Sequence, residues 1–298
     1  MKKYKVCVYA ITKNEEKFVN RWFNSMKEAD EIYVLDTGST DNTINLLKSL
    51  GVNVTVKEIH PWRFDVARNE SLELVPKDTD ICVCTDLDEV FESGWRKELE
   101  KLWEPNARIR YNYNWSFDKY NKPAINFYIE KIHSRDNYEW VHPVHEVLKT
   151  SIKEKIITTN NITLNHYPDS TKSRSSYLPL LELSVQEDPN DDRNMHYLGR
   201  EYMYYKQYQK CIDTLEKHLK LKSATWKDER SASMRFIARS YLNLQKIEEA
   251  RLWYLNAIKE TPYLREPLVE IALLESDEKN YELVKKYCLK ALDITNKY

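Results

Sequence analysis

Glycine is scarce in this chain, and its scarcity excludes several kinds of nucleotide-binding site. The 298 residues contain four glycines, at positions 38, 51, 94 and 199. They form neither a G-x-G-x-x-G dinucleotide fingerprint nor a G-x-x-x-x-G-K-[ST] phosphate loop. The sequence therefore argues against a protein kinase, a P-loop ATPase, a nicotinamide-dependent dehydrogenase and nucleotidyltransferases with an N-terminal glycine-rich loop.

Long apolar runs, excess charge and clustered cysteines are also missing. No apolar run approaches the length of a membrane span, and residues 1–5 lead into a strand rather than into the core of a signal peptide. The formal net charge of -1 gives no bulk attraction to nucleic acid or to an anionic membrane. Cys82 and Cys84 alternate on an apolar run, so we expect them in the core rather than in a disulfide or metal site. These features predict a cytoplasmic protein without a nucleic-acid partner.

The first half of the chain alternates β-rich and helical runs. We expect strands at 6–11, 31–36, 52–59 and 81–85, and helices at 14–29, 42–50 and 66–74. Such alternation predicts a parallel α/β sheet, in which ligands gather at the carboxyl ends of the strands. Thr12, Asp36 and Asp86 all follow or close predicted strands. We therefore expect these three polar residues at one edge of the sheet.

The second half shows a helical repeat instead. Leu198-Gly199-x-x-Tyr202 is similar to the start of a tetratricopeptide unit, and Ile237-Ala238-x-x-Tyr241 repeats it. Gly199, Ala238 and Ala272 are then 39 and 34 residues apart (238 − 199 and 272 − 238). The pattern predicts an α/β domain over 1–170 and a tetratricopeptide-like helical domain over 171–298. A solenoid of this kind is suited to binding a peptide or to forming a homodimer.

An Asp-x-Asp sequence, Asp86-Leu87-Asp88, follows the strand predicted at 81–85. On an extended chain the side chains of Asp86 and Asp88 point the same way. Two neighbouring carboxylates repel each other unless a cation lies between them, and all-oxygen ligands suit Mg²⁺ or Mn²⁺. An isolated Asp-x-Asp is more often an acidic turn, so the interpretation depends on the other motifs.

The residues of those motifs each have both a functional and a purely structural interpretation. Asp36 could accept from a base or ribose, or it could belong to a turn in which Gly38 provides the bend and Asp41 the helix cap. Glu15 could serve a ligand or simply favour the dipole of a helix. Arg68 could pair with a diphosphate, brace the carboxylates, or form an ordinary ion pair.

Four motifs together resemble a known family. Lys13–Glu16, Asp36–Asp41, Phe64–Asn69 and Asp86–Glu89, in that order, resemble family-2 glycosyltransferases of the GT-A fold. With the helical repeats, the chain resembles bacterial lipopolysaccharide-core transferases and peptide S-glycosyltransferases. The resemblance implies a UDP-sugar or related donor, a Mn²⁺ or Mg²⁺ ion, and inversion at the anomeric carbon. The acceptor would be a peptide, protein or glycan.

The resemblance also implies roles for individual residues. The set expected at the nucleotide sugar is Thr12, Glu15, Asp36, Arg68, Asp86 and Leu87, and the set expected at the metal is Asp86, Asp88 and His166. Many relatives have Asp-Asp-Gly-Ser where this chain has Asp36-Thr37-Gly38-Ser39. The second position therefore lacks the carboxylate that would contact uracil.

The catalytic base is the least defined role in the sequence. The Glu-Asp pair that supplies it in many relatives is missing between residues 103 and 169, which leaves Asp118, Glu130, Asp136, Glu139 and Glu146. We favour Glu146, because Trp140, His142 and His145 cluster around it in the sequence. Like His166, His145 could bind metal or diphosphate, or it could be an ordinary hydrogen-bonded residue.

Aromatic residues alternate between 108 and 117, at Tyr111, Tyr113, Trp115 and Phe117. We expect most of them in the core of a sheet, although one face could stack a sugar or acceptor. The whole pattern predicts a metal-dependent inverting glycosyltransferase. The alternatives are a non-catalytic nucleotide-binding module with an interaction solenoid and, third, a nucleotidyltransferase.

Overall fold

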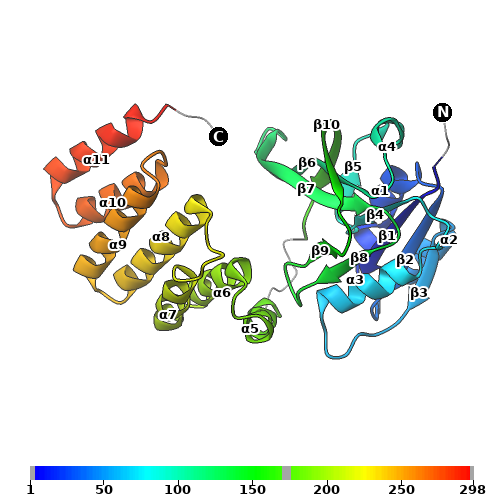
Figure 1. The fold of residues 1–298 in the computed structure, drawn as a ribbon, viewed down its shortest axis with the longest axis horizontal. Helices are drawn as coiled ribbons and strands as arrows, with labels where there is room; N and C mark the ends of the chain where they lie inside the picture. Colours follow the sequence, from blue (N-terminus) through cyan, green and yellow to red (C-terminus); the bar gives the residue numbers. More distant parts are fainter. Residues whose placement is uncertain (1–3, 170–175, 296–298) are drawn as a thin grey trace. The chain divides into compact units, whose positions relative to one another are not determined.

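The computed structural model describes residues 4–169 and 176–295, which fall into two compact units (Figure 1). The first unit covers 1–173 and the second 174–298. The domain boundary predicted between 170 and 171 lies outside the described residues. No helix in the described ranges is long and apolar enough to cross a membrane.

The first unit is an α/β domain built on an eight-stranded sheet of order β3-β2-β1-β4-β7-β6-β10-β5. Its first half comprises β1 (Val6–Thr12), α1 (Glu16–Met26), β2 (Glu31–Asp36), α2 (Thr43–Ser49), β3 (Asn53–Val56), α3 (Phe64–Glu73) and β4 (Ile81–Thr85). The four strands of this half are parallel to one another. The α/β prediction is therefore confirmed here.

The second half of the sheet is mixed, which corrects the prediction of a parallel sheet. It comprises β5 (Glu89–Phe91), α4 (Trp95–Leu102), β6 (Ala107–Phe117), β7 (Pro123–His133) and β10 (Lys155–His166). Strand β7 runs antiparallel to both β4 and β6, and β5 runs antiparallel to β10. The loop 118–122 between β6 and β7 is too short for a parallel crossover, so the two strands form a hairpin. A separate pair, β8 (Tyr138–Val141) and β9 (Val147–Thr150), is also antiparallel.

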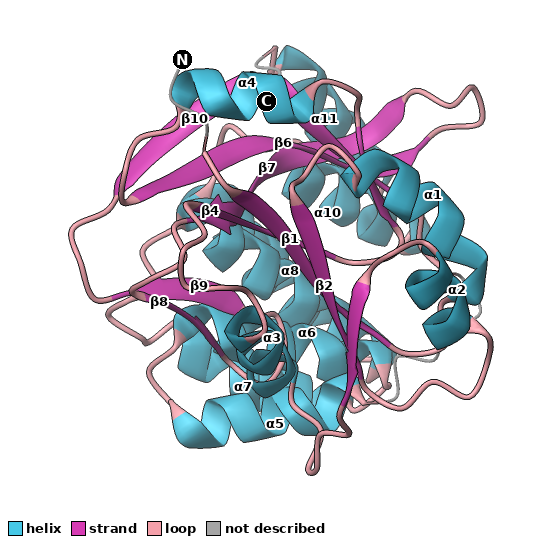
Figure 2. Cartoon of the chain, turned by 90° about the vertical axis from the view of Figure 1, so that its right-hand side faces the viewer, coloured by secondary structure: helices cyan, strands magenta, loops and turns pink. Residues whose placement is uncertain are grey.

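Both faces of the parallel half are covered (Figure 2). Every residue of β1 is buried, which is typical of a central parallel strand. Val6, Val8 and Ala10 pack with α1, α2 and α4, whereas Cys7 and Tyr9 pack with the end of α3 and the β8–β9 pair. Cys82 and Cys84 of β4 lie in the second of these clusters as buried, free thiols, as predicted.

The ends of some elements differ from the predicted ones. Asn14 does not begin the first helix, because it has a positive φ of 55° and its Oδ1 accepts from Thr40 N at 2.7 Å. Helix α1 begins at Glu16 instead and ends at Met26 rather than at 29. Strand β3 ends at Val56, three residues before the predicted end, and as an edge strand it is largely exposed.

The second unit is all-α, as predicted. It comprises α5 (Tyr177–Glu187), α6 (Asp192–Tyr204), α7 (Tyr208–His218), α8 (Lys227–Asn243), α9 (Ile247–Glu260), α10 (Glu266–Asp277) and α11 (Tyr281–Asp293). Helices α6 and α7, α8 and α9, and α10 and α11 pack as consecutive pairs. Gly199, Ala238 and Ala272 are buried on the first helix of each pair. A Cβ on Gly199 would lie 2.3 Å from Leu215 Cδ2, so the small residue permits the close packing of α6 and α7.

Candidate active site

Three polar residues predicted from the sequence lie at the carboxyl ends of neighbouring parallel strands. Thr12 and Asp36 are register partners at the ends of β1 and β2. Asp86 directly follows β4, whose last residue, Thr85, pairs with Ala10 of β1. The prediction that the sheet brings these three positions to one edge is consistent with this register.

Asp36 holds the loop that follows β2. Its side chain is fully buried, and Oδ1 accepts from Gly38 N at 2.9 Å and from Ser39 N at 2.8 Å. The Ser39 hydroxyl donates to Oδ2 at 2.5 Å. Thr12 is also buried, and within the described ranges its hydroxyl has no hydrogen-bond partner. At this edge Asp36 shapes the loop, and Thr12 contributes a buried hydroxyl without a hydrogen-bond partner among the described residues.

The β1–α1 loop is tied to the β2–α2 loop. Asn14 N donates to Ser39 Oγ at 2.8 Å, and Glu15 N donates to Thr43 Oγ1 at the same distance. Glu16 N donates to Asp41 Oδ2 at 3.2 Å. Glu15 is half-buried beside these contacts. Asp41 also accepts from Thr43 N at 3.0 Å, so it connects the first residues of α1 and α2, whereas Asn42 and not Asp41 is the N-cap of α2.

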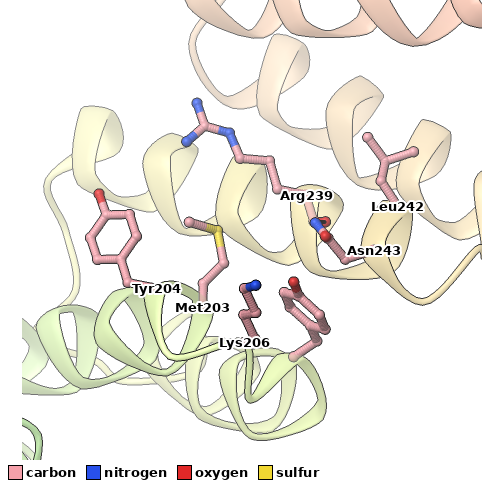
Figure 3. Close-up of a pocket in the computed structure, with 7 residues that line it drawn as sticks. Met203, Tyr204, Lys206, Arg239, Leu242 and Asn243 are labelled. Atoms are coloured by element: carbon pink, nitrogen blue, oxygen red, sulfur yellow. Dashed lines mark hydrogen bonds between the residues drawn. The ribbon is translucent and has the colours of Figure 1, made fainter.

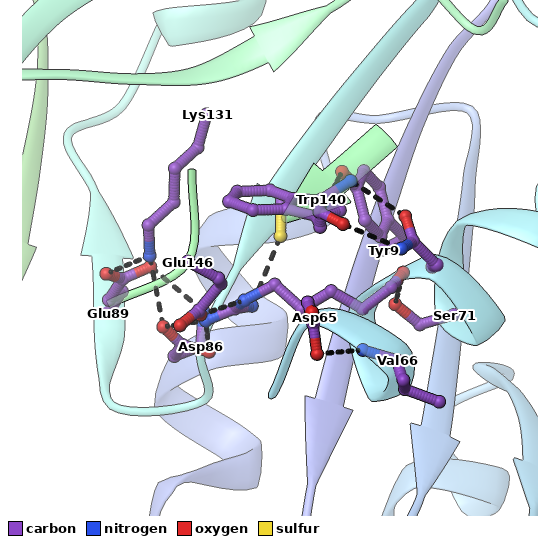
Figure 4. Close-up of polar contacts among 12 residues, drawn as sticks. Tyr9, Asp65, Val66, Ser71, Asp86, Glu89, Lys131, Trp140 and Glu146 are labelled. Carbon is purple, nitrogen blue, oxygen red and sulfur yellow. Dashed lines mark hydrogen bonds and ion pairs between the residues drawn. The ribbon is translucent and has the colours of Figure 1, made fainter. Parts of the chain in front are cut away.

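Five charged side chains form a connected ionic group that we call the Arg68 cluster: Arg68, Asp86, Glu89, Lys131 and Glu146 (Figure 4). Arg68 of α3 is 4 % exposed. Its Nη2 donates to both oxygens of Asp86 at 2.9 and 3.1 Å, and its Nε donates to Glu146. Of the three roles considered from the sequence, Arg68 therefore shows the bracing of carboxylates.

Lys131 of β7 completes the cluster, and no sequence motif singles it out. Its Nζ lies 3.0 Å from Asp86 Oδ2 and 2.8 Å from Glu89 Oε1. The following residue, Ile132, pairs with Val83 of β4. Only the antiparallel insertion of β7 beside β4 therefore places this lysine at Asp86, and the pairing was not predictable from local pattern.

The cluster shifts its two central carboxylates in opposite directions. Burial alone would raise the pKa of Asp86, but the charges of Arg68 and Lys131 outweigh it and hold that pKa well below its ordinary value. Burial raises the pKa of Glu89 above its ordinary value despite the nearby Lys131. Glu89 also accepts from Tyr113 Oη at 2.9 Å and from Asp86 N at 2.9 Å. Asp86 is thus kept ionised and fixed in position.

Asp88 and His166 form a second, separate contact. Residues 87 and 88 form a turn rather than extended strand, and Asp88 Oδ2 lies 3.4 Å from His166 Nε2. Asp88 O accepts from Tyr167 N at 2.8 Å, which fixes the turn against the end of β10. The carboxylates of Asp86 and Asp88 therefore have different partners. The side chain of Leu87 is buried in the core between them, so any ligand contact at this residue would come from its backbone.

The chemistry of this pair fits a divalent cation. His166 Nδ1 lies 3.1 Å from the Trp115 carbonyl oxygen. A carbonyl only accepts, so Nδ1 carries the proton and Nε2 of the neutral ring presents its lone pair toward Asp88. Burial lowers the pKa of His166, but the contact with Asp88 outweighs it and raises that pKa above the ordinary value. A positive charge between the two side chains is favoured, whether proton or metal.

Among the candidates for the catalytic base, Glu146 is the one that belongs to the Arg68 cluster. The loop 142–146 is held on α3, where Phe64 N donates to Pro143 O at 2.9 Å. Asn69 makes two hydrogen bonds of 2.8 Å with the backbone of Trp140. The other candidates lie elsewhere: Asp118 holds the β6–β7 turn, Glu130 pairs with Arg110, and Asp136 and Glu139 are exposed.

The alternating aromatics divide between core and surface. Tyr111 and Tyr113 are buried, as predicted. Trp115 is 45 % exposed and stacks on His166 at a ring distance of 4.5 Å. Phe117 stacks on Tyr167. The expectation of a core position thus holds for the first two residues, and Trp115 presents an aromatic surface beside the Asp88–His166 pair.

The helical unit has a concave surface of its own (Figure 3). This groove has a volume of about 340 Å³ and is lined by Met203, Tyr204, Lys206, Tyr208, Arg239, Leu242 and Asn243. Tyr204 is 56 % exposed, and its neighbour Tyr205 is also exposed. Tyr204 is the last residue of α6 and Tyr205 follows it, so both lie beyond Tyr202, the last buried residue of that helix.

Comparison with known proteins identifies the first unit. The family model of "Glycosyl transferase family 2" matches residues 7–152. The N-terminal unit is a family 2 glycosyltransferase domain. The match includes all four sequence motifs and, except for Asp88's partner His166, every residue of the two ionic groups described above.

Curated relatives of this glycosyltransferase domain are known from Rickettsia. An "Uncharacterized glycosyltransferase" of Rickettsia bellii (strain RML369-C) is 35% identical over 108 residues, which is 36% of this chain and 35% of the relative. One from Rickettsia typhi (strain ATCC VR-144 / Wilmington) is 34% identical over 108 residues, 36% of each chain. The matched segment spans about a third of these relatives' length.

Solved structures also show a low similarity to part of the chain. The match to Pseudomonas aeruginosa PilF covers 40% of this chain and 53% of the PilF chain, with 15% identity and a TM-score of 0.35. The match to MamA covers 43% of this chain and 76% of the MamA chain, with 14% identity and the same TM-score. The tetratricopeptide-like architecture rests on the helix pairs and the repeated sequence themselves.

Proposed function

We propose that the protein is a metal-dependent inverting glycosyltransferase that uses a UDP-sugar or related nucleotide sugar. The observation that carries the proposal is the Asp88–His166 pair beside the Arg68 cluster, after β4 of a family 2 glycosyltransferase domain. A carboxylate and an imidazole with a fixed tautomer supply two ligands for Mn²⁺ or Mg²⁺, and the phosphate oxygens of a donor would supply others. When bound, the ion would stabilise the negative charge of the departing nucleoside diphosphate.

The residues at the strand ends would hold the nucleoside. Thr12 offers a buried hydroxyl, and Asp36 shapes the loop 37–39 beside it. Glu15 is tied to the same pair of loops. Asp86 would meet the ribose as a fixed, ionised acceptor, because Arg68 and Lys131 keep it charged. Leu87 would contribute through its backbone.

Glu146 is the proposed catalytic base. Inversion requires a carboxylate that takes the acceptor's proton on the face opposite the leaving group. Arg68 orients Glu146 and Asp86 at once, so one arginine would set the base relative to the donor site. Trp115 would provide a stacking surface for a sugar ring of donor or acceptor. A peptide, protein or glycan acceptor, a homodimer through the helical unit and a cytoplasmic location remain predictions.

The proposal is tested by release of UDP from a panel of UDP-sugars, with Mn²⁺ or with EDTA. We expect turnover of one donor that needs the metal and is lost in Asp88→Ala. Glu146→Gln should lose turnover but keep UDP binding, because it retains the shape of the side chain without its basicity. Asp136→Asn, an exposed carboxylate outside the site, is the matched control and should behave as wild type.

A thermal-shift assay with UDP and Mn²⁺ separates the remaining outcomes. Stabilisation by UDP without transfer to any acceptor would favour the non-catalytic nucleotide-binding module with an interaction solenoid. Release of pyrophosphate rather than UDP would favour a nucleotidyltransferase. If UDP and UDP-sugars neither react nor raise the melting temperature, the nucleotide-sugar assignment is wrong.

A further inference from the structure

A second group of metal-ligand side chains lies in the helical unit and shares no residue with the set proposed for sugar transfer. Among the residues that the structure describes, one group of three His, Cys, Asp or Glu side chains brings its ligand atoms within 4.8 Å of one another: Asp192, His218 and Glu229. Asp192 begins α6, His218 ends α7, and Glu229 lies in the first turn of α8. The three helix ends of two successive pairs therefore meet at this point.

His218 is the buried member, and its ring is aimed into the group. The side chain is fully buried, and Nε2 has no hydrogen-bond partner in the described part of the chain. Glu229 Oε1 lies 3.4 Å away, but without the alignment of a hydrogen bond. A proton on Nε2 would thus be poorly satisfied, and a lone pair there would face two carboxylates. A buried polar atom in either state needs a partner that the protein alone does not supply.

The other ring nitrogen is held as in a metal-binding histidine. His218 Nδ1 lies 3.0 Å from Ser233 Oγ, and the same hydroxyl lies 2.7 Å from His196 Nδ1. When His218 Nδ1 donates to Ser233, the Ser233 hydroxyl donates in turn to His196, and His218 Nε2 keeps its lone pair. Metal-ligating histidines are usually oriented in this way through their second nitrogen.

The distances between the ligand atoms fit a small ion with tetrahedral coordination. Zn²⁺ binds imidazole nitrogen and carboxylate oxygen at about 2.0–2.2 Å, which sets ligand atoms about 3.4 Å apart at the corners of a tetrahedron. The distance between His218 Nε2 and Glu229 Oε1 is 3.4 Å. A carboxylate oxygen of Asp192 lies within 4.8 Å of the ligand atoms of both residues. Asp192 is half-exposed and Glu229 is 12 % exposed, so an ion can reach the site and keep water as a fourth ligand.

We propose that Asp192, His218 and Glu229 bind one Zn²⁺ ion that joins α6, α7 and α8. One nitrogen and two oxygens favour Zn²⁺ over Mg²⁺ or Ca²⁺, which prefer all-oxygen sites. Two carboxylates and a neutral histidine leave a site of near-zero net charge when the ion is bound. The ion stabilises the first helix pair and its junction with the second, because it bridges three elements that are separate in the unfolded chain.

The test uses the full-length chain in an Asp88→Ala background, so that the metal site proposed for sugar transfer is removed. After EDTA treatment, incubation with Zn²⁺ and desalting, we expect about one zinc per chain by mass spectrometry of the metal. Co²⁺ in place of Zn²⁺ should give the intense visible bands of a four-coordinate site. Adding Glu229→Gln should lower zinc affinity at least about tenfold, and Ser233→Ala by about 10–100-fold, as for other outer-shell partners.

Glu282→Gln is the matched control, since it removes an exposed carboxylate from the first turn of α11 that does not belong to the Asp192–His218–Glu229 group. It should leave zinc binding unchanged. Hydrogen exchange in each variant checks folding, and zinc should slow exchange in α6–α8 but not in α11 or the α/β unit. No zinc retained in the Asp88→Ala chain, or equal retention in Glu229→Gln, would overturn the proposal.

Discussion

The two units arrange their charged side chains differently. In the α/β unit the Arg68 cluster joins residues from α3, the β4–β5 turn, β5, β7 and the β8–β9 loop, with Arg68 and Glu146 separated by 78 positions. In the helical unit Arg230 pairs with Glu260 and Arg251 with Glu275, at separations of 30 and 24. The first arrangement exists only after the whole sheet has formed. The second requires only neighbouring helix pairs, as is typical of repeat proteins.

This difference predicts how far the destabilising effect of a substitution extends in each unit. A change in the Arg68 cluster should affect several elements of the α/β unit together, because each contributes a partner. A substitution in the helical unit should destabilise only the altered repeat and its neighbours. The four predictions that follow test this contrast, and hydrogen exchange by mass spectrometry reports each unit separately.

The largest effect is expected for Arg68→Met. The substitution keeps much of the side-chain volume but leaves Asp86 and Glu146 without their shared cation. Removing one partner of a buried ion pair costs about 3–5 kcal/mol. Urea unfolding should show this loss in the α/β unit, with no change in exchange of the helical unit. A loss below about 1 kcal/mol would contradict a central role for Arg68.

Gly199→Ala should destabilise the helical unit alone. The added Cβ would lie 2.3 Å from Leu215 Cδ2 and would push α7 away from α6. Overpacking of this kind costs about 1–3 kcal/mol. Faster exchange should be confined to α6, α7 and the adjoining helices. Equal effects throughout α8–α11 would show that the unit does not behave as a chain of locally coupled repeats.

Acid should weaken the α/β unit through His133. This side chain is fully buried between Tyr9 Oη and the Ser134 carbonyl, and burial lowers its pKa to about 3. Between an unfolded pKa near 6.5 and this folded value, the unfolded chain binds one proton more. Its contribution is therefore complete above pH 6.5 and is lost as pH falls, by roughly 1.4 kcal/mol per pH unit. Unfolding of wild type and His133→Gln over this range measures the slope, which should be smaller in the variant.

The smallest effect is expected for Lys210→Gln in the helical unit. Lys210 Nζ lies 4.0 Å from Glu182 Oε1, and both side chains are well exposed. Exposed pairs of this kind contribute about 0.2–1 kcal/mol, and salt screens them. Unfolding at low and high salt should show a small difference that disappears at high salt. A larger, salt-independent loss would point to packing of the lysine stem on Tyr202 instead.

Local sequence pattern predicted the regular elements of the parallel half well. The predicted strands at 31–36 and 81–85 coincide with β2 and β4, because each is a short apolar run bounded by polar residues. Where a loop residue has a long-range partner, the local rule failed. Asn14 resembles a helix cap, yet it is recruited by Thr40 across the sheet edge, and α1 starts two residues later.

The candidate site was predicted in part. The motifs drew attention to Asp86, Asp88, His166 and Glu146, and the structure places them in two ionic groups. The strand rule also predicted that Asp86 and Asp88 point the same way, but the turn at 87–88 gives them different partners. Lys131 was missed, because a lysine in an exposed-looking hairpin strand gives no local signal.

The sequence by itself determined the order of the elements, the two classes of structure and the acidic turn after β4, because these follow from short-range periodicity and residue type. Only the tertiary structure decided the antiparallel insertion of β7, the partners of each carboxylate, and the meeting of Asp192, His218 and Glu229. Those features join positions tens of residues apart, and such contacts depend on strand order and helix packing rather than on any local pattern.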